Sequence, residues 1–142
     1  MQPVYRWEFT IPSDAIDRNG HVNNVRFVQW MQDVATAHAK ASGATDAAEA
    51  TGCTWFARSH HIEYLKEAFE HDRIAILTWI VDFGRARSRR RFRFYRTNDM
   101  ALLARAETEW VFVDAKSSRL RTIPEAVIAC FQAMGEEEIG LD

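Results

Sequence analysis

The sequence predicts an α+β fold in which one antiparallel sheet packs against one long helix. Tyr5–Ile11 alternates between apolar and polar residues, which is typical of a half-buried strand. Val25–Ser42 places its apolar residues at the spacing of one helical face. Four further alternating segments follow, at residues 55–65, 73–83, 88–96 and 101–113. Strands joined by short turns pair antiparallel, so we expect five strands in one sheet with the helix on one face.

The composition indicates one globular domain over residues 1–142, with 47% hydrophobic and 27% charged residues. A net charge of −2 argues against nucleic acid or an acidic membrane as partner. Cys53 and Cys130 lack metal-ligand spacing and are expected to be reduced core thiols. The chain has no apolar run near the ~20 residues of a membrane helix. It enters a strand pattern at once, without a signal peptide, so we expect a cytoplasmic protein.

The first strand is expected to end at Pro12, and residues 13–24 then form a polar loop. Gly20 is expected to take a positive φ in that loop. Asn23 and Asn24 are both candidates for the N-cap of the long helix, and Gly43 is a favourable stop at its end.

The second half of the chain has turn signals at 84–86, 98–99 and 114–118. The last strand is expected to present one face made of Leu102, Ala104, Ala106, Thr108, Trp110 and Phe112. Thr122–Glu125 is typical of a capping box with an early helical proline. It predicts a short helix at Pro124–Met134, and the acidic tail Gly135–Asp142 is expected to fray.

One helix cannot cover a five-stranded sheet completely. A second copy packing alongside would bury the remainder, so we expect a homodimer at least.

The motif D-x-N-G-H-V-N-N-V-x-F at residues 17–27 resembles the signature of hotdog-fold acyl thioesterases, which include 4-hydroxybenzoyl-CoA thioesterase-like bacterial enzymes and plant acyl-ACP thioesterases. Residues 62–68, 106–114 and 121–124 are similar to that family's second strand with its exit, its last strand and its closing segment. The resemblance implies a single hotdog fold, a five-stranded antiparallel sheet wrapped around one long central helix with a short C-terminal helix. It also implies a dimer or tetramer with sites at the subunit interface.

Asp17 stands where the family has its catalytic carboxylate, so the resemblance implies that it attacks the acyl carbon or takes a proton from water. The sequence leaves both mechanisms open, and a loop aspartate can also simply cap a turn. Backbone N–H groups near Asn24 and Val25, at the positive end of the helix, would hold the developing oxyanion.

Asn19 and His21 match the asparagine and histidine of the plant acyl-ACP thioesterase pattern, which implies that they orient the carboxylate or the water. His21 could equally be a structural donor in the loop. Glu67 falls at an acidic position of the plant members, although a solvated turn residue is an alternative. Ala68 stands where those members often have cysteine, which excludes a nucleophilic thiol at that point.

Arginines cluster between residues 85 and 93. Arg85, Arg87 and Arg90 are candidates to bind the phosphates of coenzyme A or to dock an acidic acyl carrier protein. The alternative is a solvated strand face, because arginines alternate with Phe92 and Phe94.

No metal site is expected. His60 and His61 would point to opposite faces of a strand, which leaves too few ligands on either side. His38 on the helix is expected to be a hydrogen-bonded core residue. We expect no cofactor, with coenzyme A present only as part of the substrate.

The sequence therefore predicts an acyl-CoA or acyl-ACP thioesterase that releases a free acid and a thiol. The alternative is a non-catalytic hotdog protein that binds acyl-CoA as a sensor or scaffold. The presence of Asp17, Asn19 and His21 together favours the enzyme.

Overall fold

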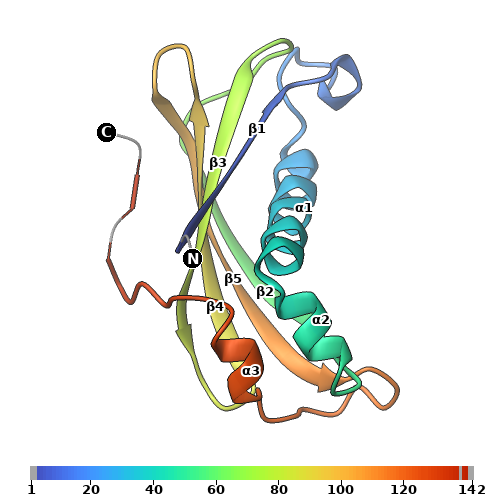
Figure 1. The fold of residues 1–142 in the computed structure, drawn as a ribbon. Helices are drawn as coiled ribbons and strands as arrows, with labels where there is room; N and C mark the ends of the chain where they lie inside the picture. The colour runs from blue at the N-terminus through green and yellow to red at the C-terminus, as the bar shows by residue number, and fades with distance from the viewer. Residues whose placement is uncertain (1–2, 138, 141–142) are drawn as a thin grey trace.

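The computed structural model describes residues 3–137 and 139–140. Five strands form one antiparallel sheet in the spatial order β1-β3-β4-β5-β2 (Figure 1). Their bounds are β1 Val4–Thr10, β2 Cys53–Tyr64, β3 Arg73–Phe83, β4 Arg87–Arg96 and β5 Ala101–Asp114. This architecture confirms the predicted α+β hotdog fold.

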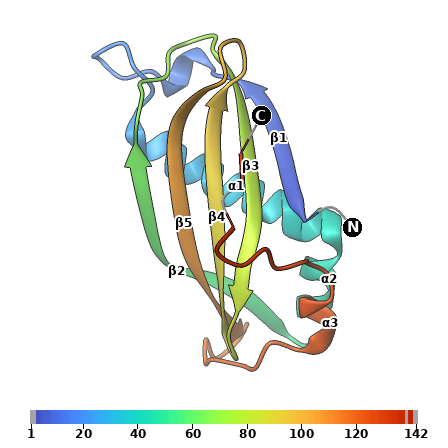
Figure 2. The same cartoon turned by 90° about the vertical axis from the view of Figure 1, so that its left-hand side faces the viewer.

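The long helix α1 (Asn24–Ser42) lies across one face of the curved sheet, and α2 (Ala44–Glu49) continues from its end (Figures 1 and 2). Gly43 separates the two helices with a φ of 88°, a left-handed conformation that glycine adopts without steric cost. The predicted stop at Gly43 is therefore confirmed.

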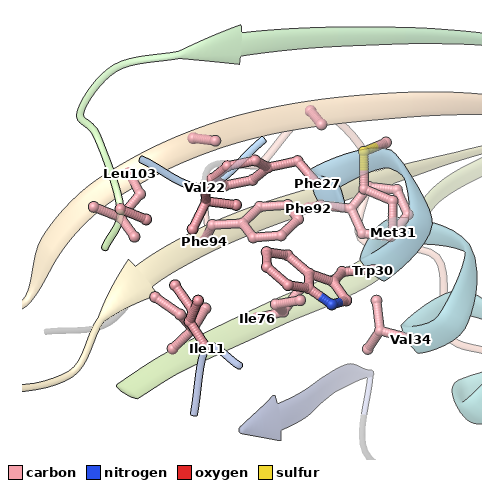
Figure 3. Packing of buried hydrophobic residues seen from close by; sticks show 14 of the residues in the cluster. Ile11, Val22, Phe27, Trp30, Met31, Val34, Ile76, Phe92, Phe94 and Leu103 are labelled. Carbon is pink, nitrogen blue, oxygen red and sulfur yellow. The ribbon is translucent and has the colours of Figure 1, made fainter. Parts of the chain in front are cut away.

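The main core lies between α1 and the sheet, where aromatic and aliphatic side chains from both layers interdigitate (Figure 3). Met31 and Val34 of α1 are 0% exposed, as is Phe94 of β4. Burying each such side chain contributes roughly 1.5–3 kcal/mol. Phe92 and Phe94 share this inner face, as the alternation along β4 predicts.

One strand face differs from the prediction at Leu102. Phe94 pairs with Ala104 but Tyr95 pairs with Leu102, so Leu103 is the extra residue of a β-bulge. Leu103 therefore enters the core, and Leu102 packs against Tyr95 on the outer face. A shift of one residue exchanges the two faces, which a simple alternation cannot predict.

The C-terminal tail crosses the outer face of the sheet instead of fraying along its whole length (Figure 2). The Met134 N–H donates to the Ile80 carbonyl at 2.8 Å. The Glu136 carboxylate accepts hydrogen bonds at 2.6 Å from both Arg89 and Arg91. The expectation of a frayed tail is wrong for these residues because two strand arginines bind the Glu136 carboxylate and the tail backbone bonds to β3. The fraying expected at residues 138 and 141–142 lies outside the described residues.

The closing helix is much shorter than predicted. Of the predicted segment Pro124–Met134, only Glu125–Ile128 forms a helix, α3. Pro124 precedes it in an extended conformation. The predicted capping box is wrong, because the Thr122 hydroxyl accepts a hydrogen bond from Arg85 at 2.8 Å and no side chain caps α3.

Candidate functional site

The site residues begin in a tight loop between η1 (Ser13–Ala15), a short 3-10 helix, and α1. Ile16 and Val22 form an isolated antiparallel bridge that closes this loop. Within it, the Asp17 N–H donates to the His21 carbonyl at 2.8 Å. Gly20 has a φ of 84°, which confirms the positive φ predicted there.

This loop fixes the Asp17 carboxylate. Its Oδ1 accepts hydrogen bonds from the backbone N–H of Asn19 at 2.9 Å and from that of His21 at 3.3 Å. Its Oδ2 has no hydrogen-bond partner among the described residues. Asp17 therefore does cap its own turn, but one carboxylate oxygen is left available to a ligand or to water.

The start of α1 resolves the choice between the two candidate N-caps. The N-cap is Asn23, whose Oδ1 accepts from the Val25 N–H at 3.0 Å. The expectation that the Val25 N–H serves an oxyanion is therefore wrong, because Asn23 already occupies it. The Asn24 N–H makes no hydrogen bond within the described chain. This donor lies in the first turn, where the helix dipole is positive.

His21 and Glu67 come together although they are distant in sequence. The Val22 N–H donates to the Ala68 carbonyl at 2.9 Å, which holds the exit of β2 against the loop. His21 Nε2 then lies 3.5 Å from Glu67 Oε2, an ion pair whenever the imidazole is protonated. The His21 ring also contacts the ring of Phe69 edge-on.

Tyr64 is a site residue that sequence reasoning missed. Its hydroxyl donates to the Asn24 carbonyl at 3.1 Å, and its ring packs on Phe27. It lies at the end of β2, immediately before the predicted strand exit, and this position is the signal that could have identified it. The contact ties the strand to the first turn of α1.

These residues line one open groove of about 540 Å³, which we call the Asp17 groove. It brings together all five predicted catalytic residues, Asp17, Asn19, His21, Asn24 and Glu67. Two exposed residues with apolar surface, Tyr64 and Leu65, line its edge, and Leu65 is 44% exposed. The groove thus combines a carboxylate, a free N–H donor and an apolar rim.

The predicted arginines do not join this groove. Arg85 and Arg87 are exposed at the β3–β4 turn, where Arg87 lies 3.7 Å from Asp82. That turn is at the opposite end of the sheet from the loop that holds Asp17 (Figure 1). Arg90 does not join them either, because its side chain is 3% exposed and faces α1.

The described residues contain no group of three side chains that could hold a metal ion. His60 bonds the Thr108 hydroxyl at 2.8 Å, whereas His61 lines a charged depression with Glu63. The two histidine side chains thus lie in different surroundings, as predicted from their neighbouring positions on one strand. Within the same part of the chain, no helix has the length and apolar character needed to cross a membrane.

Residues 11–131 match the sequence model of the thioesterase-like superfamily. The chain belongs to this superfamily. The match begins directly after β1 and spans the Asp17 loop, α1, α2, strands β2 to β5 and α3. No functionally curated protein matches the sequence.

Solved structures of thioesterases share the fold. A 1,4-dihydroxy-2-naphthoyl-CoA thioesterase from Synechocystis is 16% identical with a TM-score of 0.80, covering 89% of this chain and 94% of its own. A hypothetical protein from Staphylococcus aureus, solved in complex with CoA, is 17% identical with a TM-score of 0.81. The match covers 98% of this chain and 96% of that protein. The 12:0-ACP thioesterase from Umbellularia californica is 22% identical with a TM-score of 0.82, and this chain spans 53% of its length.

Proposed function

We propose that this thioesterase-superfamily protein hydrolyses an acyl thioester to a free acid and a thiol, with the chemistry in the Asp17 groove. The observation that carries the proposal is the hydrogen bonding of the Asp17 carboxylate, which differs between its two oxygens. Two backbone N–H groups hold Oδ1, and Oδ2 is left without a partner in the described structure. A carboxylate oriented in this way can act without first breaking a bond to its own loop.

Asp17 has two routes to the product. It can attack the acyl carbon, expel the thiolate and form an anhydride that water then cleaves. It can instead take a proton from a water molecule that attacks the same carbon. Both routes place negative charge on the thioester oxygen in the transition state, so both need a nearby donor.

The free N–H of Asn24 is the proposed oxyanion donor. It points from the first turn of α1, so the partial positive charge of the helix end supports it. Tyr64 holds the carbonyl of the same residue at 3.1 Å, which fixes the orientation of this peptide group. Asn24 thus serves through its backbone, while Asn23 provides the helix cap.

His21, Glu67 and Asn19 are proposed to position the reactants. The His21–Glu67 pair lies beside the Asp17 loop, where it can hold a water molecule or the carbonyl-bearing end of the substrate. The Asn19 N–H fixes the carboxylate itself at 2.9 Å. Substituting His21 or Glu67 would disturb the approach of the substrate more than the stability of the fold, whereas a substitution at Asn19 keeps the backbone N–H that holds Asp17.

A second copy of the chain is proposed to close the groove. Strand β2 lies at the edge of the sheet, and its residues 56–61 and 63–64 are exposed. A long exposed edge strand readily pairs with another strand. Antiparallel pairing of two β2 strands would cover the apolar rim and exclude water, which strengthens the oxyanion interaction.

The same pairing would give Arg85 and Arg87 a role. Antiparallel pairing places the Tyr64 end of one β2 strand beside the Cys53 end of the partner's β2 strand. The β3–β4 turn of one copy would then lie on the side of the partner's Asp17 groove. We propose that these arginines contact the phosphates of coenzyme A there. The CoA-bound and acyl-ACP-specific structures with this fold support a CoA or carrier-protein thioester as the substrate.

The proposal is tested by thiol release from a panel of acyl-CoA and acyl-ACP thioesters of graded size, with binding of the same compounds measured in parallel. We expect hydrolysis of at least one class well above the rate without protein. Tight acyl-CoA binding with no hydrolysis across the panel would instead support the non-catalytic sensor.

A further inference from the structure

A second cavity lies at the other end of α1 from the Asp17 groove. It has a volume of about 200 Å³, and its wall includes Ala39, Ala48, Trp55, Ile80, Phe83 and Phe131. Thr36 and Glu49 line it too and are exposed, so they mark its opening to solvent. A dry cavity of roughly 150 Å³ can hold a benzene molecule, so this space suits a small apolar body.

Arg90 places a guanidinium in the wall of this cavity although the residue is 3% exposed. Its Nη1 donates to His38 Nδ1 at 2.9 Å and to the Thr78 hydroxyl oxygen at 3.1 Å. Its Nε and Nη2 donate to no described residue. No carboxylate of the described chain lies within salt-bridge distance of it.

The neighbours of Arg90 do not neutralise its charge. His38 accepts through Nδ1 and is uncharged at neutral pH, because burial and the Arg90 charge lower its pKa to about 4. Thr78 donates its own proton to the Arg91 carbonyl at 2.9 Å. Burial lowers the pKa of Arg90 itself to about 9, which reflects a charge without a counter-ion. An unpaired buried charge is costly, and an incoming anion would relieve that cost.

We propose that this space, the Arg90 cavity, binds the carboxylate end of a small apolar molecule. Nε and Nη2 of a guanidinium form a fork that matches the two oxygens of a carboxylate. Trp110 also lines the cavity, and its buried indole Nε1 has no hydrogen-bond partner in the described part of the chain. The carboxylate of Glu49 near the opening repels each negative charge of a ligand, so a ligand with one charge is disfavoured less than a ligand with several.

The carboxylate can come from two sources. One is a free organic acid. The other is the far end of an acyl group whose thioester lies in the Asp17 groove, and this source rests on the proposed function. In the antiparallel β2 pairing, the Tyr64 end of one copy adjoins the Cys53 end of its partner, and Cys53 and Trp55 line the Arg90 cavity. The acyl group would then reach from one copy into the other.

Binding is tested first, without any need for catalysis. Benzoate and cyclohexanecarboxylate are titrated into the protein by calorimetry, with benzamide and cyclohexanecarboxamide as neutral partners of the same shape. We expect each acid to bind at least about tenfold more tightly than its amide, because a charged hydrogen bond is worth more than a neutral one. Equal affinity for acid and amide, or no binding of the acids, would overturn the proposal.

Three variants locate the binding. Ala39→Phe fills the cavity but leaves Arg90 in place, whereas Ala41→Phe on the exposed side of α1 adds the same ring outside it. We expect Ala39→Phe to abolish acid binding and Ala41→Phe to retain it. Arg90→Gln is expected to remove the preference for acid over amide. Thermal unfolding establishes that each variant is folded, and full acid binding by a folded Ala39→Phe would place the site elsewhere.

Turnover then separates the two sources. Glutaryl-CoA is compared with pentanoyl-CoA, which has the same chain length without the terminal carboxylate. If Arg90→Gln lowers kcat/KM for glutaryl-CoA about tenfold and spares pentanoyl-CoA, the ligand is the acyl end. If both rates are unchanged while acid binding is lost, the ligand is a free acid. If the parent hydrolyses neither of these thioesters nor any other member of the panel, the proposed function fails, yet the calorimetry still shows whether the cavity binds a carboxylate.

Discussion

Oδ1 of Asn23 accepts the backbone N–H of Val25 at 3.0 Å, and this contact decides which amide at the start of α1 remains free. The capping bond belongs to Asn23, so the adjacent Asn24 N–H is the one left to a substrate. Two consecutive asparagines thus have separate roles that the sequence does not distinguish.

The first prediction separates these two asparagines. Asn23→Ala removes the cap and should lower the free energy of unfolding by about 1 kcal/mol. Asn24→Ala keeps the cap and the backbone N–H, so both stability and turnover should stay close to the parent. Urea denaturation and thiol release on the same preparations measure both effects. A larger loss of stability in Asn24→Ala than in Asn23→Ala would contradict the assigned cap.

The second prediction concerns acid stability. Burial first, and the Arg90 charge second, lower the pKa of His38 to about 4. The unfolded imidazole has a pKa of about 6.5, so between these two pKa values the unfolded chain binds more protons and stability falls as the pH drops. We expect His38 to contribute a loss of about 2–3 kcal/mol between about pH 7 and pH 4.

His38→Gln serves as the comparison for this loss, because its amide oxygen can still accept from Arg90 without titrating. Denaturation at several pH values should show a shallower decline in His38→Gln than in the parent. Parallel declines would show that the stability lost in acid comes from other groups.

The third prediction concerns the proposed nucleotide contacts. Arg85→Ala combined with Arg87→Ala should raise KM for acyl-CoA about tenfold, since charged contacts to phosphate are lost. KM for a short acyl thioester without the nucleotide should not change. Arg119→Ala, another exposed arginine, is the matched control. An unchanged KM for acyl-CoA in the double variant would leave both arginines as surface residues only.

The fourth prediction concerns assembly through β2. Phe56 is 44% exposed on this strand, whereas Leu120 is 54% exposed outside β2, where it forms an isolated bridge with Val113. A charge on Phe56 would have to be buried in the proposed interface. Sedimentation should therefore show that Phe56→Glu dissociates the parent dimer, whereas Leu120→Glu leaves it intact. A monomeric parent, or a dimer unaffected by Phe56→Glu, would exclude this mode of pairing.

Much of the fold could be predicted because apolar spacing and turn residues act locally. The long helix begins at Asn24, one residue from the prediction, and β3 has its predicted bounds. The misplacement of Leu102 arose from a β-bulge, which depends on the neighbouring strand. The tail was missed for a similar reason, because Glu136 is held by arginines more than forty positions earlier in the chain, at 2.6 Å.

The site residues that belong to one sequence motif could be predicted. Those that reach their positions through tertiary contacts were less predictable. Asp17, Asn19, His21 and Asn24 come from one short stretch, and the structure gathers them in one groove with Glu67. The Tyr64 contact to Asn24 depends on how the end of β2 meets α1. The interior position of Arg90 follows from β4 alternation combined with the packing of α1, whereas its sequence context suggested a surface cluster.

The most direct measurement of the central claim is kcat/KM for the best thioester in the parent, in Asp17→Asn and in Asp14→Asn. The amide oxygen of Asp17→Asn can still accept the two backbone bonds, so the loop should keep its shape. Asp14 is an exposed neighbour paired with Arg26 at 3.4 Å, which makes it the matched control. We predict a loss of at least about 100-fold in Asp17→Asn and parent-like turnover in Asp14→Asn. Turnover by a folded Asp17→Asn within a few-fold of the parent would contradict the catalytic role of this carboxylate.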